Sequence, residues 1–165
     1  MGKALGSWSG MRKYLEQEML CDSLKGRVQY DFTWYPKFGG NSAVFTVCLD
    51  DQAVKKFGVG VAYKALNQQG YDLKYLDDAI NTIPFAERND FTDYEFSEAL
   101  EIYRNQPISE SIYSENPIVR MFAIVDRRVG KRTLIKMRDT VGIQPEWLRP
   151  FYEIRFASEG IHHTV

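Results

Sequence analysis

The stretch from residue 120 to residue 139 contains the side chains best suited to binding a charged ligand. It carries seven cations against two acids, Asp126 and Asp139. The cations are Arg120, Arg127, Arg128, Lys131, Arg132, Lys136 and Arg138. Clustered lysines and arginines bind phosphates, nucleic acids and acidic proteins. We therefore take these seven residues as candidate partner-binding or nucleic-acid-binding residues.

Acidic residues gather in a different segment, residues 72–98. This segment has eight acids against Lys74 and Arg88, in a chain whose net charge is −1. The acids are Asp72, Asp77, Asp78, Glu87, Asp90, Asp93, Glu95 and Glu98. Such separation of charge favours pairing of the two segments, either within one molecule or between subunits. Pairing would explain both segments, whereas a nucleic-acid surface would explain only the basic one.

A protein partner and nucleic acid are the two alternatives to internal pairing. Proteins that bind single-stranded nucleic acid combine cations with exposed aromatic side chains, on which the bases stack. The aromatic residues of this chain lie mostly outside the basic stretch. The sequence therefore favours a protein partner or self-association over nucleic acid.

A weaker hypothesis concerns a divalent metal. Asp50 or Asp51 at a strand end, with the Asp-x-Lys of Asp72 and Lys74, is similar to the metal-binding set of restriction-type nucleases. In such a site the acids hold Mg²⁺ and the lysine orients a water molecule. We favour the simpler interpretation that Asp50 and Asp51 form a hairpin turn and that Asp72 caps a helix.

Other catalytic arrangements find little support in the sequence. The two histidines, His162 and His163, lie close to the last residue, away from any serine or cysteine nucleophile in the sequence. The two cysteines, Cys21 and Cys48, have no metal-like spacing, and we expect both to be reduced. Glu18 falls within an apolar stripe, where we favour an edge position or an arginine partner over a role as a catalytic acid. We expect no cofactor and lean towards a protein that is not an enzyme.

Length and composition fit one compact domain over residues 1–165. The chain is 44% hydrophobic and 14% aromatic, which is too apolar for a disordered protein. A subdivision into residues 1–70 and 71–165 is an alternative. No apolar run approaches the ~20 residues of a membrane span, so we expect a cytoplasmic protein without membrane association.

The first part of the chain is predicted to form one helix and a small sheet. Residues 9–26 have a helical apolar period that ends at Gly26. Alternating or apolar runs follow in "RVQYDFTWY", "SAVFTVCLD" and "AVKKF". They predict a three-stranded antiparallel meander over residues 27–57.

The remainder of the chain is predicted to be mainly helical, which makes the fold class α+β. Thr92 and Glu95 form a capping box ahead of a helix over residues 93–105. Asn116 and Pro117 begin a helix with an apolar stripe up to residue 129, and Pro150 must kink or restart the last helix. Two shorter helices are expected over residues 61–70 and 72–84.

The whole chain resembles a group of small uncharacterised bacterial proteins known from predicted open reading frames. The strings that carry the resemblance are "WSGMRKYLEQEML", "LKGRVQY", "FTDYEFSEALE", "NPIVRMFAIVDRRVGKRTL" and "PEWLRPFYEIR". The resemblance implies a bacterial, cytoplasmic protein and brings no activity, cofactor or site residue.

Overall fold

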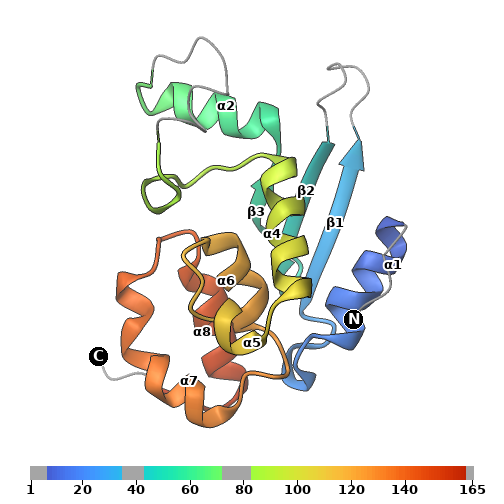
Figure 1. Cartoon of the computed structure of the whole chain (residues 1–165), viewed down its shortest axis with the longest axis vertical. Coiled ribbons are helices and arrows are strands. Elements are labelled where there is room, and N and C mark those ends of the chain that lie inside the picture. The colour runs from blue at the N-terminus through green and yellow to red at the C-terminus, as the bar shows by residue number, and fades with distance from the viewer. Residues whose placement is uncertain (1–6, 35–42, 72–82, 163–165) are drawn as a thin grey trace.

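The computed structural model describes residues 7–34, 43–71 and 83–162, and these residues form an α+β fold (Figure 1). An N-terminal helix leads into a three-stranded antiparallel sheet, and the rest is mostly helical. The predicted fold class is therefore confirmed. The helix expected over residues 72–84 lies almost entirely outside the described residues.

The N-terminal helix is shorter than the predicted range of residues 9–26. Helix α1 (Trp8–Lys13) is capped by Ser7, whose hydroxyl accepts a hydrogen bond from the N–H of Gly10. It continues as a π-helical turn (Tyr14–Glu18), a wider geometry that a helical apolar period does not predict.

Residues 19–21 leave the helix because they pair with a distant part of the chain. The N–H of Cys21 donates to the carbonyl of Val125 at 3.0 Å, and the N–H of Arg127 donates to the carbonyl of Met19 at 2.8 Å. Tertiary pairing here overrides the local helical pattern. Gly26, with a φ of +81°, follows a separate 3-10 turn (Asp22–Leu24) and so does not end the predicted helix.

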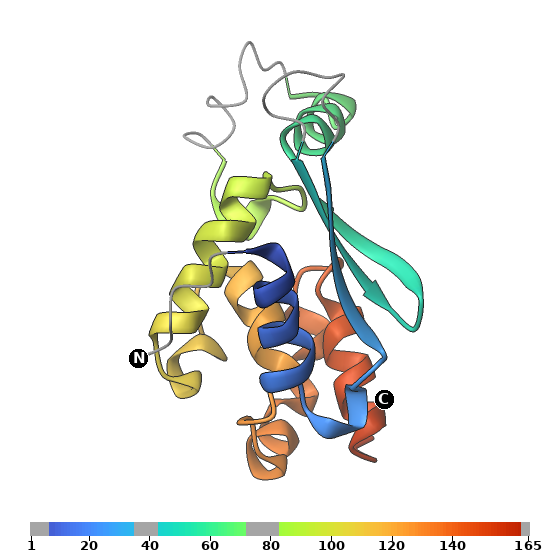
Figure 2. The same ribbon diagram turned by 90° about the vertical axis from the view of Figure 1, so that its right-hand side faces the viewer.

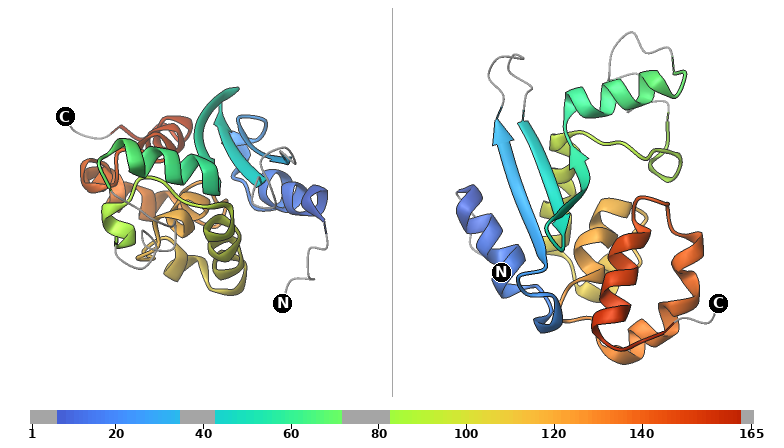
Figure 3. Two further views of the ribbon diagram at one scale, coloured as in Figure 1. Left: turned by 90° about the horizontal axis from the view of Figure 1, so that it is seen from above. Right: turned by 180° about the vertical axis from the view of Figure 1, so that it is seen from behind.

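The sheet is the predicted meander, with strand order β1-β2-β3. Its strands are β1 (Val28–Trp34), β2 (Ala43–Leu49) and β3 (Gln52–Phe57). The first pair keeps one register along its length, and the second is shifted by a bulge at Val47 and Cys48. The outer edge of β1 is covered by the N-terminal segment (Figure 3), where the N–H of Tyr30 donates to Glu16 Oε2 at 2.9 Å. This bond satisfies an edge donor that would otherwise be open to another strand.

The described helices after the sheet are α2 (Val59–Gln68), α4 (Asp93–Asn105), α5 (Ile108–Ser111), α6 (Pro117–Ile124), α7 (Lys131–Met137) and α8 (Arg149–Ser158). Short 3-10 turns occur at Phe85–Glu87 and Arg138–Ile143. The capping box of Thr92 and Glu95 forms as predicted, and the Asn116 side chain caps α6. Pro150 restarts a helix at α8 instead of kinking a longer one.

Helix α6 lies at the centre of the core, and it ends at residue 124, earlier than the predicted 129. All of its residues except Arg120 are buried. Phe122 contacts the rings of Tyr30 on β1 and Tyr103 on α4, with centroids 5.9 and 5.4 Å apart. In Figure 2, where the sheet is turned towards its edge, α4 and α6 lie on the same side of it. None of the helices in the described ranges is long and apolar enough to cross a membrane.

Candidate functional site

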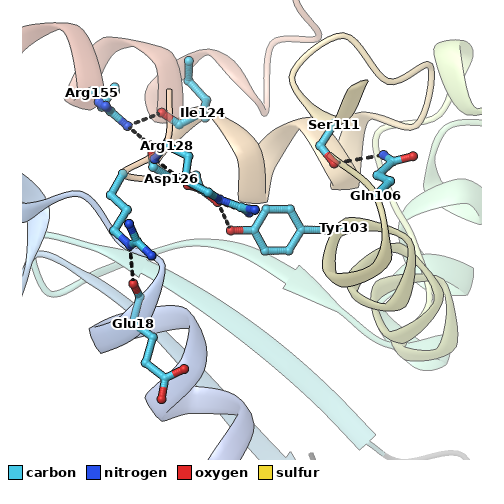
Figure 4. A network of polar contacts seen from close by, with 9 residues as sticks. Glu18, Tyr103, Gln106, Ser111, Ile124, Asp126, Arg128 and Arg155 are labelled. Atoms are coloured by element: carbon cyan, nitrogen blue, oxygen red, sulfur yellow. Dashed lines mark hydrogen bonds and ion pairs between the residues drawn. The ribbon is translucent and has the colours of Figure 1, made fainter. Parts of the chain in front are cut away.

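The connection between α6 and α7 is organised around Asp126, which is buried. The hydroxyl of Tyr103 donates a hydrogen bond to Asp126 Oδ2, and the guanidinium of Arg128 lies against both carboxylate oxygens. Figure 4 shows the side chains of Tyr103 and Arg128 meeting at this carboxylate. Burial, followed by the charge of Asp126, raises the pKa of Tyr103 well above 10.0. Tyr103 is therefore protonated at neutral pH and acts as a donor to Asp126.

The side chain of Arg155, on α8, binds backbone carbonyls of the same connection. Its side chain is buried, and its Nη atoms donate at 2.7–3.1 Å to the carbonyls of Ile124, Asp126 and Val129. Its Nε lies 3.2 Å from Glu159 Oε1. A buried guanidinium is costly unless its donors are used. These bonds therefore fix the path of the chain between α6 and α7, and so the direction in which α7 starts.

Arg120 of α6 serves the fold in a similar way. Its Nη1 donates to the carbonyl of Ser114 at 2.6 Å, and its Nε donates to Gln144 Oε1 at 3.2 Å. Burial raises the pKa of the Tyr152 hydroxyl, and the nearby charge of Arg120 partly offsets that rise. Arg120 thus ties the start of α6 to the end of the 3-10 turn before α8.

Arg127 and Arg128 are also used within the molecule. Arg127 is exposed, and its Nε donates to the backbone carbonyl of Glu18 at 2.8 Å. The Glu18 side chain is itself exposed, which agrees with the favoured interpretation of an edge residue. A hydrogen bond to Asp126 is the main cause that raises the pKa of Arg128.

The remaining four candidates are different, because they have no partner within the described part of the chain. Lys131, Arg132, Lys136 and Arg138 make no ion pair and no side-chain hydrogen bond with any described residue. Helix α7 buries Leu134 and Met137 and leaves Ile135 43% exposed among the cations. We call the exposed residues Lys131, Arg132, Ile135 and Lys136 the basic face.

A shallow pocket of about 460 Å³ adjoins the basic face and shares Lys136 with it. Two apolar side chains stand at this pocket, Tyr113 at 63% exposure and Ile143 at 82%. Arg120 also lines it, opposed by one carboxylate, that of Glu115. The pocket therefore offers aromatic and aliphatic contact next to two cations.

The predicted pairing between the basic stretch and the acids of residues 72–98 is not found inside the molecule, among the residues described. Glu95 is buried with Arg88, whose Nη1 lies 3.1 Å from Glu95 Oε1, and Asp90 lies 3.7 Å from Lys55 Nζ. These acids are satisfied by closer cations. Asp72, Asp77 and Asp78 lie outside the described residues.

The acids of the metal hypothesis occupy a hairpin turn. Asp50 and Asp51 connect β2 to β3 with φ angles of +49° and +65°, and this confirms the turn interpretation. The carboxylate of Asp50 accepts two hydrogen bonds from Arg27, at 2.8 and 3.0 Å. Asp72 is not among the described residues, and within those residues no group of three or more His, Cys, Asp or Glu could hold a metal ion.

Lys55, a largely buried lysine of β3, is not among the candidate residues predicted from the sequence. Its Nζ lies 5.1 Å from the ring centre of Trp147 and 5.8 Å from that of Phe91, and it donates to the carbonyl of Asn89. Burial lowers its pKa. The sequence could have predicted this burial, because Lys55 and the apolar Phe57 are two residues apart on one strand and therefore lie on the same face. Lys55 fastens the segment before α4 to the sheet.

These elements define a small α+β protein with unpaired cations on one short helix beside a shallow pocket. The chain belongs to the SF0329 protein family, whose model matches residues 7–156. The match includes the sheet, the helices α4 to α7 and most of α8. The chain matches no curated protein and no solved structure.

Proposed function

We propose that this chain is a cytoplasmic bacterial protein that acts by binding another protein chain and not by catalysis. The binding surface is the basic face together with the adjoining pocket, and the partner surface is acidic. The proposal is supported by four cations that have no partner among the described residues, Lys131, Arg132, Lys136 and Arg138. The other three candidate cations support the fold, so these four supply the charge for a partner.

The apolar side chains beside these cations support a protein partner. Ile135, Tyr113 and Ile143 are all more than 40% exposed, and two of them stand at the pocket. Protein interfaces gain affinity mainly from apolar and aromatic anchors, while charges steer the encounter and select the partner. A surface with both features fits an acidic segment that also presents apolar side chains.

Nucleic acid fits the same surface less well. Single-stranded nucleic acid stacks on exposed aromatic rings, and among the described residues that line the pocket Tyr113 is the one aromatic. The carboxylate of Glu115 lines the same pocket and would repel a phosphate. The exposed isoleucines add nothing to a phosphate contact.

A quantitative pull-down with two charge-matched variants tests the proposal. The first variant is Lys131→Glu, Arg132→Glu and Lys136→Glu, on the basic face. The control reverses three exposed lysines elsewhere, Lys13, Lys56 and Lys64, and so makes the same change in net charge. We expect wild type and control to retain an acidic protein that the first variant loses.

Two results would overturn the proposal. Equal retention by both variants would show that the basic face is not the binding surface. Bound material that nuclease treatment removes would identify nucleic acid as the ligand. Phosphate contacts would also weaken steeply with salt, because each neutralised phosphate releases counterions.

A further inference from the structure

Two nearby regions of this chain, separated by residues 116–126, are opposite in charge. Residues 93–115 contain six acids and the single cation Arg104, whereas residues 127–138 contain six cations and no acid. The first region includes α4, and the second includes the basic face. Within the described residues no ion pair joins the two regions.

Helix α4 presents an exposed acidic stripe. Its buried side consists of Glu95, Phe96, Ala99, Leu100 and Tyr103. On the opposite side Glu98, Glu101 and Ile102 are exposed, at spacings of three and four residues that place them on one helix face. We call these three residues the acidic face.

The charge of the acidic face is only partly used inside the molecule. The side chain of Glu98 has no ion pair or hydrogen bond with any described residue. Glu101 accepts hydrogen bonds from Arg104 at 2.9 Å and from Asn105 at 3.0 Å, one on each carboxylate oxygen, but its side chain remains 60% exposed. An exposed pair of this kind contributes little and still leaves carboxylate oxygen open to a partner.

We infer that the acidic partner of the basic face is the acidic face of a second copy of this chain. The inference rests on the proposed function and names the partner at the same surface. The two faces are complementary. The acidic face has two acids and Ile102, which is 42% exposed, and the basic face has three cations and Ile135, which is 43% exposed. Figure 1 shows α4 upright beside the sheet and α7 across the lower end of the molecule. The residues of both faces are exposed.

The contact joins two different patches, so its geometry sets the assembly. If two copies are related by a two-fold axis, each basic face meets the other copy's acidic face and a dimer closes. Any other rotation repeats the contact into a ring or a chain of copies. The molar mass in solution distinguishes these assemblies, and each of them contains the inferred contact.

Light scattering coupled to size-exclusion chromatography, at low salt and rising concentration, tests the inference by charge exchange. Variant A is Lys131→Glu and Lys136→Glu, and variant B is Glu98→Lys and Glu101→Lys. Each variant alone brings like charges together and should remain at the monomer mass of 19.1 kDa. The wild-type protein should have a molar mass above that of the monomer. An equimolar mixture of A and B should associate again, because each altered face then meets a face of opposite charge. A control variant, Glu146→Lys and Glu153→Lys, should behave as wild type.

The inference fails if wild type stays at 19.1 kDa throughout, if A or B alone associates as wild type does, or if the mixture stays monomeric. Circular dichroism checks the fold of each variant. Should a reversed variant not fold, Glu98→Gln with Glu101→Gln replaces it and must weaken the association. A monomeric wild type that still retains an acidic protein in the pull-down refutes the second copy alone. A monomeric wild type that retains nothing refutes the proposed function as well.

Discussion

Asp126 and Arg128 are two residues apart in the sequence and form an ion pair where the chain passes from α6 to α7, with Arg128 Nη2 2.7 Å from Asp126 Oδ2. The carboxylate side chain is fully buried and the guanidinium is 33% exposed. The backbone N–H of Arg128 also donates to Asp126 Oδ1 at 2.7 Å. The pair therefore stabilises the turn that precedes α7. Arg128 is thus used within the fold, whereas the cations of α7 are available to a partner.

Asp126→Ala should destabilise the protein by about 2–3 kcal/mol. Losing one partner of a fully buried ion pair typically costs about 3–5 kcal/mol, and the partial exposure of Arg128 reduces that figure. The change also leaves the buried Tyr103 hydroxyl without its acceptor. Urea unfolding measures the loss.

Glu101→Ala is the matched control for Asp126→Ala, because it removes an exposed acid paired with Arg104. It should cost less than about 1 kcal/mol. Equal costs for the two substitutions would show that Asp126 does not organise the α6–α7 connection.

Phe122→Ala should cost about 3–5 kcal/mol, since a buried aromatic side chain leaves a cavity when truncated. Phe122 is 1% exposed and contacts both the sheet and α4. Arg127→Glu, at an exposed position in the same region, should change the melting temperature only slightly and less at high salt. A reversed order of the two effects in thermal unfolding would mean that the orientation of α6 is wrong.

Arg128→Glu should not resemble Arg127→Glu, although the sequence presents both as surface cations. It would place a second carboxylate beside the buried one of Asp126, and like charges in one site repel. We expect a distinctly lower melting temperature than for Arg127→Glu. Similar melting temperatures would contradict the pairing with Asp126.

Asp51→Gly should stabilise the hairpin between β2 and β3. The φ of Asp51 is +65°, a conformation that costs most L-residues roughly 1–2 kcal/mol and glycine almost nothing. Asp51→Val should destabilise the protein by a similar amount, because a β-branched side chain tolerates positive φ poorly. Chemical denaturation of both variants should give shifts of opposite sign, and shifts of the same sign would count against this turn.

The carboxyl of Asp50 should titrate below its ordinary pKa of 3.8, because it accepts hydrogen bonds from Arg27. A carboxyl with a lowered folded-state pKa adds stability that is present above the unfolded-state value and is lost as pH falls through the folded-state value. Its contribution should therefore disappear only below about pH 3.8. NMR titration should show the lowered midpoint in wild type and an ordinary one in Arg27→Gln, and an unchanged midpoint in that variant would exclude Arg27 as the cause.

Elements with local signals were predictable from the sequence. The capping box of Thr92 and Glu95 lies at the start of α4, and Asn116 and Pro117 begin α6, because these residues satisfy or omit the free N–H groups at a helix start. The meander was predictable because apolar residues alternate or run continuously along the strands and because the turn at Asp50 is short.

Features that depend on distant contacts were not predictable. The helix of the N-terminal segment stops early because residues 19–21 pair with residues 125–127. In the candidate site, the sequence identifies seven cations but does not show that Arg120 and Arg128 are bound within the fold. That division depends on the burial of Asp126 and on the position of Gln144, which only the tertiary structure sets.

Site-specific photo-cross-linking from position 135 tests whether the basic face binds an acidic protein partner. A photoreactive residue replaces Ile135 on the basic face, and the control replaces Tyr63 on α2, which is 38% exposed. Mass spectrometry of the digested adducts identifies what each position contacts. Adducts from position 135 should be acidic peptides, including residues 93–105 of a second copy, and should be absent from position 63. Adducts to nucleic acid, or the same adducts from both positions, would contradict an acidic protein partner on this face.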